Sequence, residues 1–110
     1  LFSCPENLAS MSGEMKAFFD RTYYPALGKI EGRPYATLIA AGLDGEGAQR
    51  QIDRIVMGWR LRRVAPPVIA RLGAQTPDEI MAPKTVPEEV LGKCREMGQL
   101  LSNGLSMGIF

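Results

Sequence analysis

The sequence predicts an α/β fold in which a parallel sheet is covered by helices on both faces. Apolar segments of strand length alternate with segments whose apolar residues recur at helical spacing. One run, Tyr35–Ala41, is apolar without polar alternation, which is typical of a parallel strand covered on both faces. With 110 residues, of which 45% are hydrophobic, the chain is expected to form a single domain over residues 1–110.

The first two elements are the end of a strand and a helix. Leu1–Ser3 has the character of a buried strand end, and Cys4–Gly13 is expected to be the loop that leads from it into the helix. Either Ser10 or Ser12 can cap this helix through its hydroxyl oxygen. The helix should end near Tyr24–Pro25, because proline disfavours helical geometry in the preceding residue. Its apolar face carries Met15, Phe18, Phe19 and either Thr22 or Tyr23.

The middle of the chain predicts a strand, a turn, a helix and an edge strand. The strand Tyr35–Ala41 is followed by the glycine-rich turn Gly42–Gly47. In the next helix, Gln49, Arg50, Asp53 and Arg54 are expected on the polar side, opposite Ala48, Ile52, Ile55, Val56 and Trp59. The segment Val64–Ala70 contains Pro66 and Pro67, which cannot donate hydrogen bonds to a neighbouring strand. This segment is therefore expected at the edge of the sheet.

Two helices complete the predicted fold. Thr76 and Glu79 form a capping box with Pro77 between them, so a short helix should begin there and end at Pro83. A longer helix is expected over residues 87–106. Its apolar stripe consists of Val90, Leu91, Cys94, Met97, Leu101 and Leu105.

Composition excludes several classes of function. Thirteen basic and twelve acidic residues leave a net charge of +1, so we expect neither nucleic acid nor a membrane as partner. The chain contains no histidine, which excludes Ser-His-Asp and Cys-His catalytic systems and His-ligated zinc within these residues. We expect no metal site and no catalytic side chain, so redox chemistry would require a bound cofactor. Cys4 and Cys94 are expected to be free thiols of a cytoplasmic protein.

The two loops at the carboxyl ends of the predicted parallel strands are the candidate ligand sites. Cys4–Gly13 could offer backbone N–H groups and small side chains to a flat ring with polar edges, or it could be an ordinary connection that only caps a helix. Gly42–Gly47 contains three glycines, which permit close approach of a ligand, or it could be a flexible turn. It matches neither the P-loop nor the G-x-G-x-x-G pattern.

The segment from Ser10 to Arg21, SMSGEMKAFFDR, resembles the helix start M-S-G-x-M-K-x-F-x-D-R of a flavoprotein family. This family comprises the NAD(P)H-dependent FMN reductases and quinone oxidoreductases related to the Trp-repressor-binding protein, within the flavodoxin-like superfamily. The similarity covers Pro5–Arg21 and continues to about Val64. It implies a doubly wound parallel sheet that is incomplete here. The first two strands, the phosphate loop and most of the third strand would be missing, so the chain would be the C-terminal portion of one domain.

The resemblance also implies a cofactor and its binding residues. Flavin contacts would come from the first loop through Pro5, Glu6, Asn7, Leu8, Ser10 and Met11, and from the second through Ala41, Gly42, Leu43, Asp44 and Gly45. The implied function is an oxidoreductase that passes hydride from NAD(P)H through FMN to a quinone or similar small-molecule acceptor. Homo-oligomers are possible for such a protein at full length.

Two other functions compete with this one. A flavodoxin-type electron carrier would bind FMN without oxidising NAD(P)H, but it would shield the flavin with an aromatic residue that Gly42–Gly47 lacks. A phosphate-accepting receiver domain would need a lysine after its last strand, where Arg71–Ala74 has none.

Several prominent side chains have structural interpretations. Trp59 is expected in the core, and Tyr23 and Tyr24 in packing contacts. Asp20 and Arg21 are expected to form a surface charge pair, and the basic cluster of Arg60, Arg62 and Arg63 to be solvated.

Overall fold

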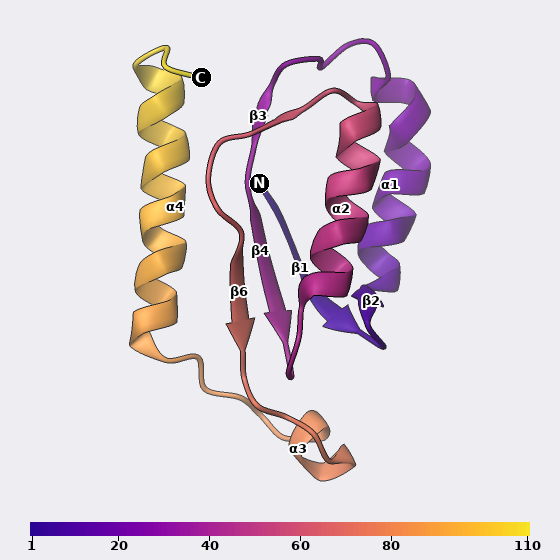
Figure 1. Ribbon diagram of the computed structural model, residues 1–110, viewed down its shortest axis with the longest axis vertical. Helices are drawn as coiled ribbons and strands as arrows, with labels where there is room; N and C mark the ends of the chain where they lie inside the picture. The colour runs from indigo at the N-terminus through magenta and orange to yellow at the C-terminus, as the bar shows by residue number, and fades with distance from the viewer.

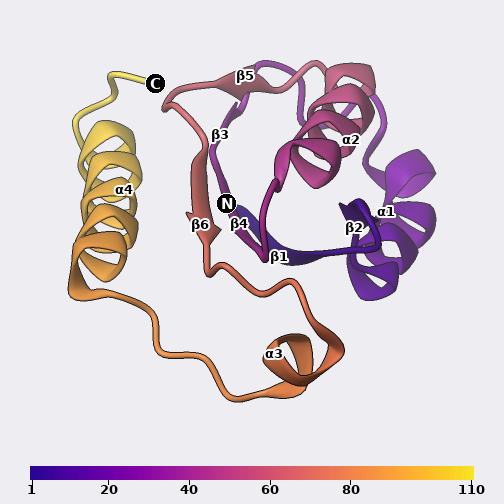
Figure 2. The same ribbon diagram turned by 60° about the horizontal axis from the view of Figure 1, so that its bottom comes forward.

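The computed structural model describes residues 1–110 and confirms an α/β architecture (Figure 1). Three parallel strands, β1 (Phe2–Asn7), β4 (Thr37–Ala41) and β6 (Val68–Arg71), form the central sheet in the order β1-β4-β6. The helices α1 (Gly13–Ala26) and α2 (Glu46–Gly58) cover one face, and α4 (Glu88–Ser106) lies on the other (Figure 2). The predicted alternation of strands and helices and the edge position of the last strand are therefore confirmed.

The first strand is longer than expected and folds into a hairpin. Cys4–Asn7 belongs to β1, so the prediction that this segment is a loop is wrong. A short strand, β2 (Ser10–Met11), pairs antiparallel with the end of β1, with Glu6 opposite Met11. This pairing makes the sheet mixed rather than wholly parallel. A pattern of two residues is too short to predict a strand, which is why the sequence did not reveal β2.

The segment before β6 also differs from its prediction. Arg62–Arg63 forms β5, which pairs in parallel with β3 (Pro34–Tyr35) in a separate small sheet. β6 begins only at Val68, because Pro66 and Pro67 cannot donate ladder hydrogen bonds. The edge strand predicted over Val64–Ala70 is thus shortened: Val68–Ala70 belongs to β6, and the residues from Val64 to Pro67 lie outside any strand.

The main core lies between the sheet and the pair of helices α1 and α2. Phe19 from α1 and Ile52 and Val56 from α2 are buried against Ile39 of β4. Trp59 is also buried, which confirms its predicted core position. Its ring stacks on Tyr23 with centroids 5.7 Å apart, and its indole N–H donates to the Tyr23 carbonyl at 2.8 Å. The side chain of Tyr24 is 78% exposed and touches Tyr23 edge-on.

A smaller core lies under α4 on the opposite face of the sheet. Met97 is buried there with Ala36 and Ala65. The predicted apolar stripe of α4 is only partly correct, because Leu91 and Leu105 are 38% and 59% exposed. The helix faces β6 but leaves much of the sheet beside it uncovered (Figure 2).

The predicted helix starts are confirmed. Ser12 caps α1 by accepting a hydrogen bond from the Met15 N–H at 3.3 Å. Thr76 caps the short helix α3 (Pro77–Met81) by accepting from the Glu79 N–H at 3.2 Å. Helix α1 includes Pro25 and ends one residue later, at Ala26.

Candidate cofactor-binding crevice

A crevice of about 610 Å³ opens at the carboxyl ends of β1 and β4. Its walls come from three segments: the β1–β2 hairpin, the end of β4 with the loop after it, and the chain from Leu72 to Lys84, which follows β6 and includes α3. The lining is largely apolar, with few polar groups. The residues are Pro5, Glu6, Asn7, Leu8, Ala9, Ala40, Ala41, Gly42, Leu43, Asp44, Leu72, Ala74, Ile80 and Lys84.

The structure brings eight of the eleven predicted contact residues to this crevice. They are Pro5, Glu6, Asn7, Leu8, Ala41, Gly42, Leu43 and Asp44. Ser10 and Met11 do not reach it, because the hairpin turn carries them to the far side of β1. Gly45 is buried beneath the crevice and does not line it.

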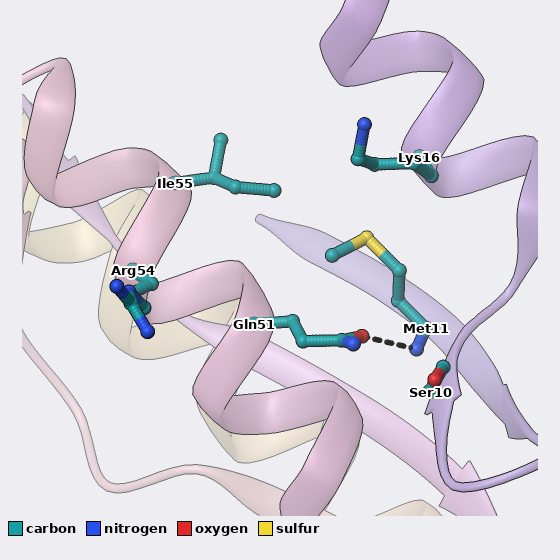
Figure 3. Close-up of a pocket in the computed structure, with 6 residues that line it drawn as sticks. All are labelled: Ser10, Met11, Lys16, Gln51, Arg54 and Ile55. Carbon is teal, nitrogen blue, oxygen red and sulfur yellow. Dashed lines mark hydrogen bonds between the residues drawn. The ribbon is translucent and has the colours of Figure 1, made fainter.

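Ser10 and Met11 instead border a hollow of about 490 Å³ between α1 and α2 (Figure 3). There the backbone N–H of Met11 donates to the Gln51 side-chain oxygen at 2.7 Å. Lys16 of α1 and Arg54 of α2 stand on opposite sides of this hollow. Lys16 is also paired with Asp20 at 2.5 Å, so the predicted pairing of Asp20 with Arg21 is wrong.

Both oxygens of the Glu6 carboxylate accept hydrogen bonds from backbone groups of the protein. It accepts hydrogen bonds from the N–H groups of Gly45 at 2.9 Å and Ala48 at 3.0 Å, at the N-terminus of α2. A helix N-terminus is the usual place for a phosphate, since its N–H groups are free and its dipole favours negative charge. Glu6 fills that place in α2. Its role in the structure is therefore to join the hairpin to the glycine-rich loop.

The glycines of the second loop allow these contacts to form. Gly45 has a φ of 86°, and a Cβ at this position would overlap the Ile69 side chain. A Cβ on Gly42 would lie 2.6 Å from the carbonyl oxygen of Ala74, so the loop after β6 rests directly on the Gly42 backbone. The hairpin, through Glu6, and the loop after β6 are therefore both packed against the glycine-rich loop.

Six lining residues were not predicted. Ala9 and Ala40 adjoin predicted positions, and the other four lie after β6: Leu72, Ala74, Ile80 and Lys84. Ile80 is 55% exposed at the rim. The signal that could have revealed them is the parallel order of the sheet, which puts the carboxyl end of β6 beside those of β1 and β4.

The hairpin turn at the rim is conformationally unusual. Leu8 and Ala9 both have positive φ, at 52° and 62°, in a two-residue turn where Asn and Gly are the favoured residues. The Leu8 side chain is 99% exposed at the same time. An apolar residue held in this way is compatible with a role in covering a ligand in the crevice.

The lining of the crevice suits a flat apolar group better than a phosphate. Leu8, Leu43, Leu72 and Ile80 offer apolar surface, and the volume is in the range of small-molecule sites. The nearest helix N-terminus is closed by Glu6. Of the lining residues, Lys84 alone is cationic, and its ammonium group is bound by the carbonyl oxygens of Ile80 and Ala82.

A second polar cluster lies in the small sheet and α2, away from the crevice. The Tyr35 hydroxyl donates to Asp53 at 2.8 Å, Gln49 donates to the same carboxylate at 3.1 Å, and Arg63 forms an ion pair with it. Arg63 is thus a partner of Asp53 rather than a solvated member of a basic cluster. Gln49 is buried and also accepts from Thr37 at 2.7 Å, so its predicted place on the polar side of α2 is wrong.

This cluster shifts the acidities of its members. Burial raises the pKa of Tyr35, and its hydrogen bond to Asp53 adds to the effect. Burial also opposes ionisation of Asp53, but hydrogen bonds from Arg63, Tyr35 and Gln49 outweigh it and lower the pKa of the Asp53 carboxyl. These groups are mutually satisfied, which indicates a stabilising network rather than a reactive site.

Neither a scan of protein-family models nor a search of curated proteins gives a match to this chain. No helix is long and apolar enough to cross a bilayer. The structure contains no cluster of three or more Cys, Asp or Glu side chains of the kind that binds a metal ion. Cys4 and Cys94 are free thiols.

Proposed function

We propose that the chain is part of a flavodoxin-like FMN-dependent oxidoreductase that transfers hydride from NAD(P)H to a quinone or similar acceptor. The observation that carries the proposal is the apolar crevice. It is lined by residues from both loops that the sequence resemblance implicates in flavin binding. β2 pairs only with Glu6 and Asn7, so the first part of β1 has a free edge. A flavodoxin-like sheet continues with further strands at this position. A helix N-terminus that binds the cofactor's phosphate would belong to those further elements, since that of α2 is occupied by Glu6.

The residues of this chain would bind and orient the flavin ring rather than exchange protons with a substrate. Leu8 and Leu43 would supply apolar contacts from opposite loops, and Gly42 lets the loop after β6 pack closely against the glycine-rich loop at the crevice. FMN would supply the redox chemistry by accepting and returning a hydride equivalent. The contribution of these residues is a fixed position for the ring and partial exclusion of water.

A flavodoxin-type electron carrier is the second candidate. Such a carrier covers its flavin with an aromatic ring, and no aromatic residue lines this crevice. An uncovered ring leaves room for a nicotinamide to stack at hydride-transfer distance, and this favours the oxidoreductase.

The test mixes the full-length protein with FMN under anaerobic conditions, adds NADH or NADPH, and follows flavin absorbance against FMN alone. We expect the protein to accelerate bleaching and a quinone to restore the yellow form. Bound flavin that stays oxidised with both nucleotides, yet accepts electrons from a partner reductase, would identify a carrier. Absence of flavin binding to the full-length protein would contradict both functions.

A charged residue introduced into the crevice tests whether the flavin binds there. Leu43 is 57% exposed there, and Leu43→Glu should weaken flavin binding about tenfold, because a carboxylate disfavours contact with the apolar ring. Leu27 is 43% exposed after α1, outside the crevice. Leu27→Glu is the matched control and should leave flavin binding unchanged. Equal affinities of the two variants would place the flavin elsewhere.

A further inference from the structure

The connection between β6 and α4 is unusually long. It covers residues 72–87, whereas most connections in α/β units have about 2 to 6 residues. The part from Gln75 to Val86, which we call the arm, contains α3 and stands apart from the sheet and the other helices (Figure 2). Loops of such length are uncommon in compact domains, and they usually serve a function. The arm is therefore a candidate for a role beyond joining two elements.

The arm is attached to the fold only at its ends. None of its residues is buried, and those from Gln75 to Thr85 are all exposed. Its hydrogen bonds have both partners within the arm. The last backbone bond to the sheet side comes just before it, where the Gly73 N–H donates to the Gly42 carbonyl at 2.7 Å. A segment with so few contacts can change its position at little cost in free energy.

The charged groups of the arm that lie near the crevice are already bound by its own backbone. The Glu79 carboxylate accepts a hydrogen bond from the Gln75 N–H at 3.0 Å. The Lys84 ammonium donates to two carbonyl oxygens at the end of α3. The remaining charged residue, Asp78, does not line the crevice. The arm thus offers no free cation to a ligand in the crevice.

The surface that the arm does offer is apolar. Ile80 lines the crevice and is 55% exposed, and Met81 beside it is 83% exposed. Because α3 buries no residue, these two side chains do not contribute to a core. Exposed apolar groups at the mouth of a pocket are typical of a binding surface. The arm starts from β6, at the edge of the sheet opposite β1, so strands added at β1 would extend the sheet away from it.

We propose that the arm selects the electron acceptor, a quinone that carries an alkyl chain, by packing Ile80 and Met81 against that chain. The inference rests on the proposed function, in which a quinone enters the crevice. An alkyl chain needs no polar partner and gains free energy from contact with exposed apolar side chains. The phosphates of NAD(P)H would need a cation, and Lys84 is held by carbonyl oxygens. The arm therefore acts on the acceptor rather than on the hydride donor.

The test compares two acceptors in the full-length protein loaded with FMN: methylbenzoquinone, and the same ring carrying a decyl chain. Ile80→Ser removes the apolar contact and preserves α3, because isoleucine and serine have similar helix propensities. Ile109 is 64% exposed near the C-terminus and does not line the crevice, so Ile109→Ser is the matched control.

The steady-state constants for the two quinones separate a contact with the chain from a general defect. In Ile80→Ser we expect KM for the decyl quinone to rise about fivefold, with kcat and the KM for methylbenzoquinone unchanged. Ile109→Ser should match the wild type with both quinones. An equal rise of KM for both quinones, or no rise for either, would overturn the role of the arm.

Limited proteolysis tests the same contact without turnover. Lys84 in the arm and Lys93 in α4 are both exposed trypsin sites. The decyl quinone should slow cleavage after Lys84, relative to Lys93, by about threefold in the wild type and not in Ile80→Ser. Protection without quinone reduction would support the contact and contradict the oxidoreductase. Reduction of both quinones without protection would contradict the role of the arm alone.

Discussion

Glu6 shows how one side chain connects two parts of the candidate site. It stands on β1, yet its oxygens bind the first N–H groups of α2, 39 and 42 positions away in sequence. The interaction satisfies N–H groups that a helix start leaves free and opposes the positive end of the helix dipole. The position of the glycine-rich loop over β1 therefore depends on this carboxylate.

Replacing Glu6 should loosen the loop. Glu6→Ala removes both hydrogen bonds, and we expect a loss of about 1 kcal/mol in the free energy of unfolding. Hydrogen exchange of the Gly45 and Ala48 amides should accelerate more than that of the Ile52 amide. Glu46 is exposed in the same first turn of α2, and Glu46→Ala is the control. Equal exchange rates in both variants would show that Glu6 does not hold the loop.

Asp53 gives the protein a pH-dependent contribution to stability. Its pKa is lowered in the folded state, where Arg63, Tyr35 and Gln49 donate to the carboxylate. A group with a lowered folded-state pKa stabilises the fold above its ordinary pKa of about 4, and this stability is lost as pH falls through the lowered value. Tyr35 behaves oppositely, because its raised pKa contributes stability that is lost as pH rises above about 10.

Asp53→Asn should therefore lower stability at pH 7 by about 1 kcal/mol, and the difference from wild type should shrink below about pH 4. Urea unfolding between pH 3 and pH 7 measures both effects. Asp20 forms an exposed ion pair with Lys16, so Asp20→Asn is a control expected to change stability by less than about 0.5 kcal/mol. A constant difference across this pH range would refute the assigned role of Asp53.

At the scale of elements, the sequence was most informative where a pattern was long. The helical spacing in α1 and α2 and the apolar run of β4 were sufficient to predict those elements. The hairpin of β1 and β2 was missed because β2 has only two residues, which is too few to form a pattern. One of its contacts also comes from a distant element, since the Gln51 side chain in α2 accepts a hydrogen bond from the Met11 N–H. Gln49 was misplaced for the same reason, since its buried polar partners cannot be inferred from helical spacing.

The candidate site was likewise predicted only in part. The positions of both loops could be predicted, because parallel strands end at one edge of the sheet. The exclusion of Ser10 and Met11 from the crevice, and the use of Glu6 within the protein, depend on tertiary contacts. Such contacts cannot be inferred from the spacing of residues along the chain.

Helix α4 is less stable than its length suggests, because it contains three glycines, Gly92, Gly98 and Gly104. Gly98 has open space around it, so Gly98→Ala should raise the free energy of unfolding by about 0.8 kcal/mol through better helix propensity. Gly104 is buried against the Phe110 ring, and the same change there should give no gain or a loss. Chemical denaturation of both variants distinguishes the two sites. A gain at Gly104 equal to that at Gly98 would show that the Phe110 contact is absent in solution.

At the scale of the whole molecule, burial is low. Of the 110 residues, 18 are buried, and the two hydrophobic cores on opposite faces of the sheet contain 9 and 3 of them. The smaller core beneath α4 has one buried residue from that helix's apolar stripe, Met97. A chain with so little interior is expected to be marginally stable by itself.

This reasoning gives a final prediction about heat. Because only 18 of the 110 residues are buried, we expect the chain by itself to melt below about 45 °C, the lower end of the range for ordinary domains. Differential scanning calorimetry of the isolated chain provides the measurement. A cooperative transition well above this temperature would mean that the two cores stabilise the chain without any further element packed against β1.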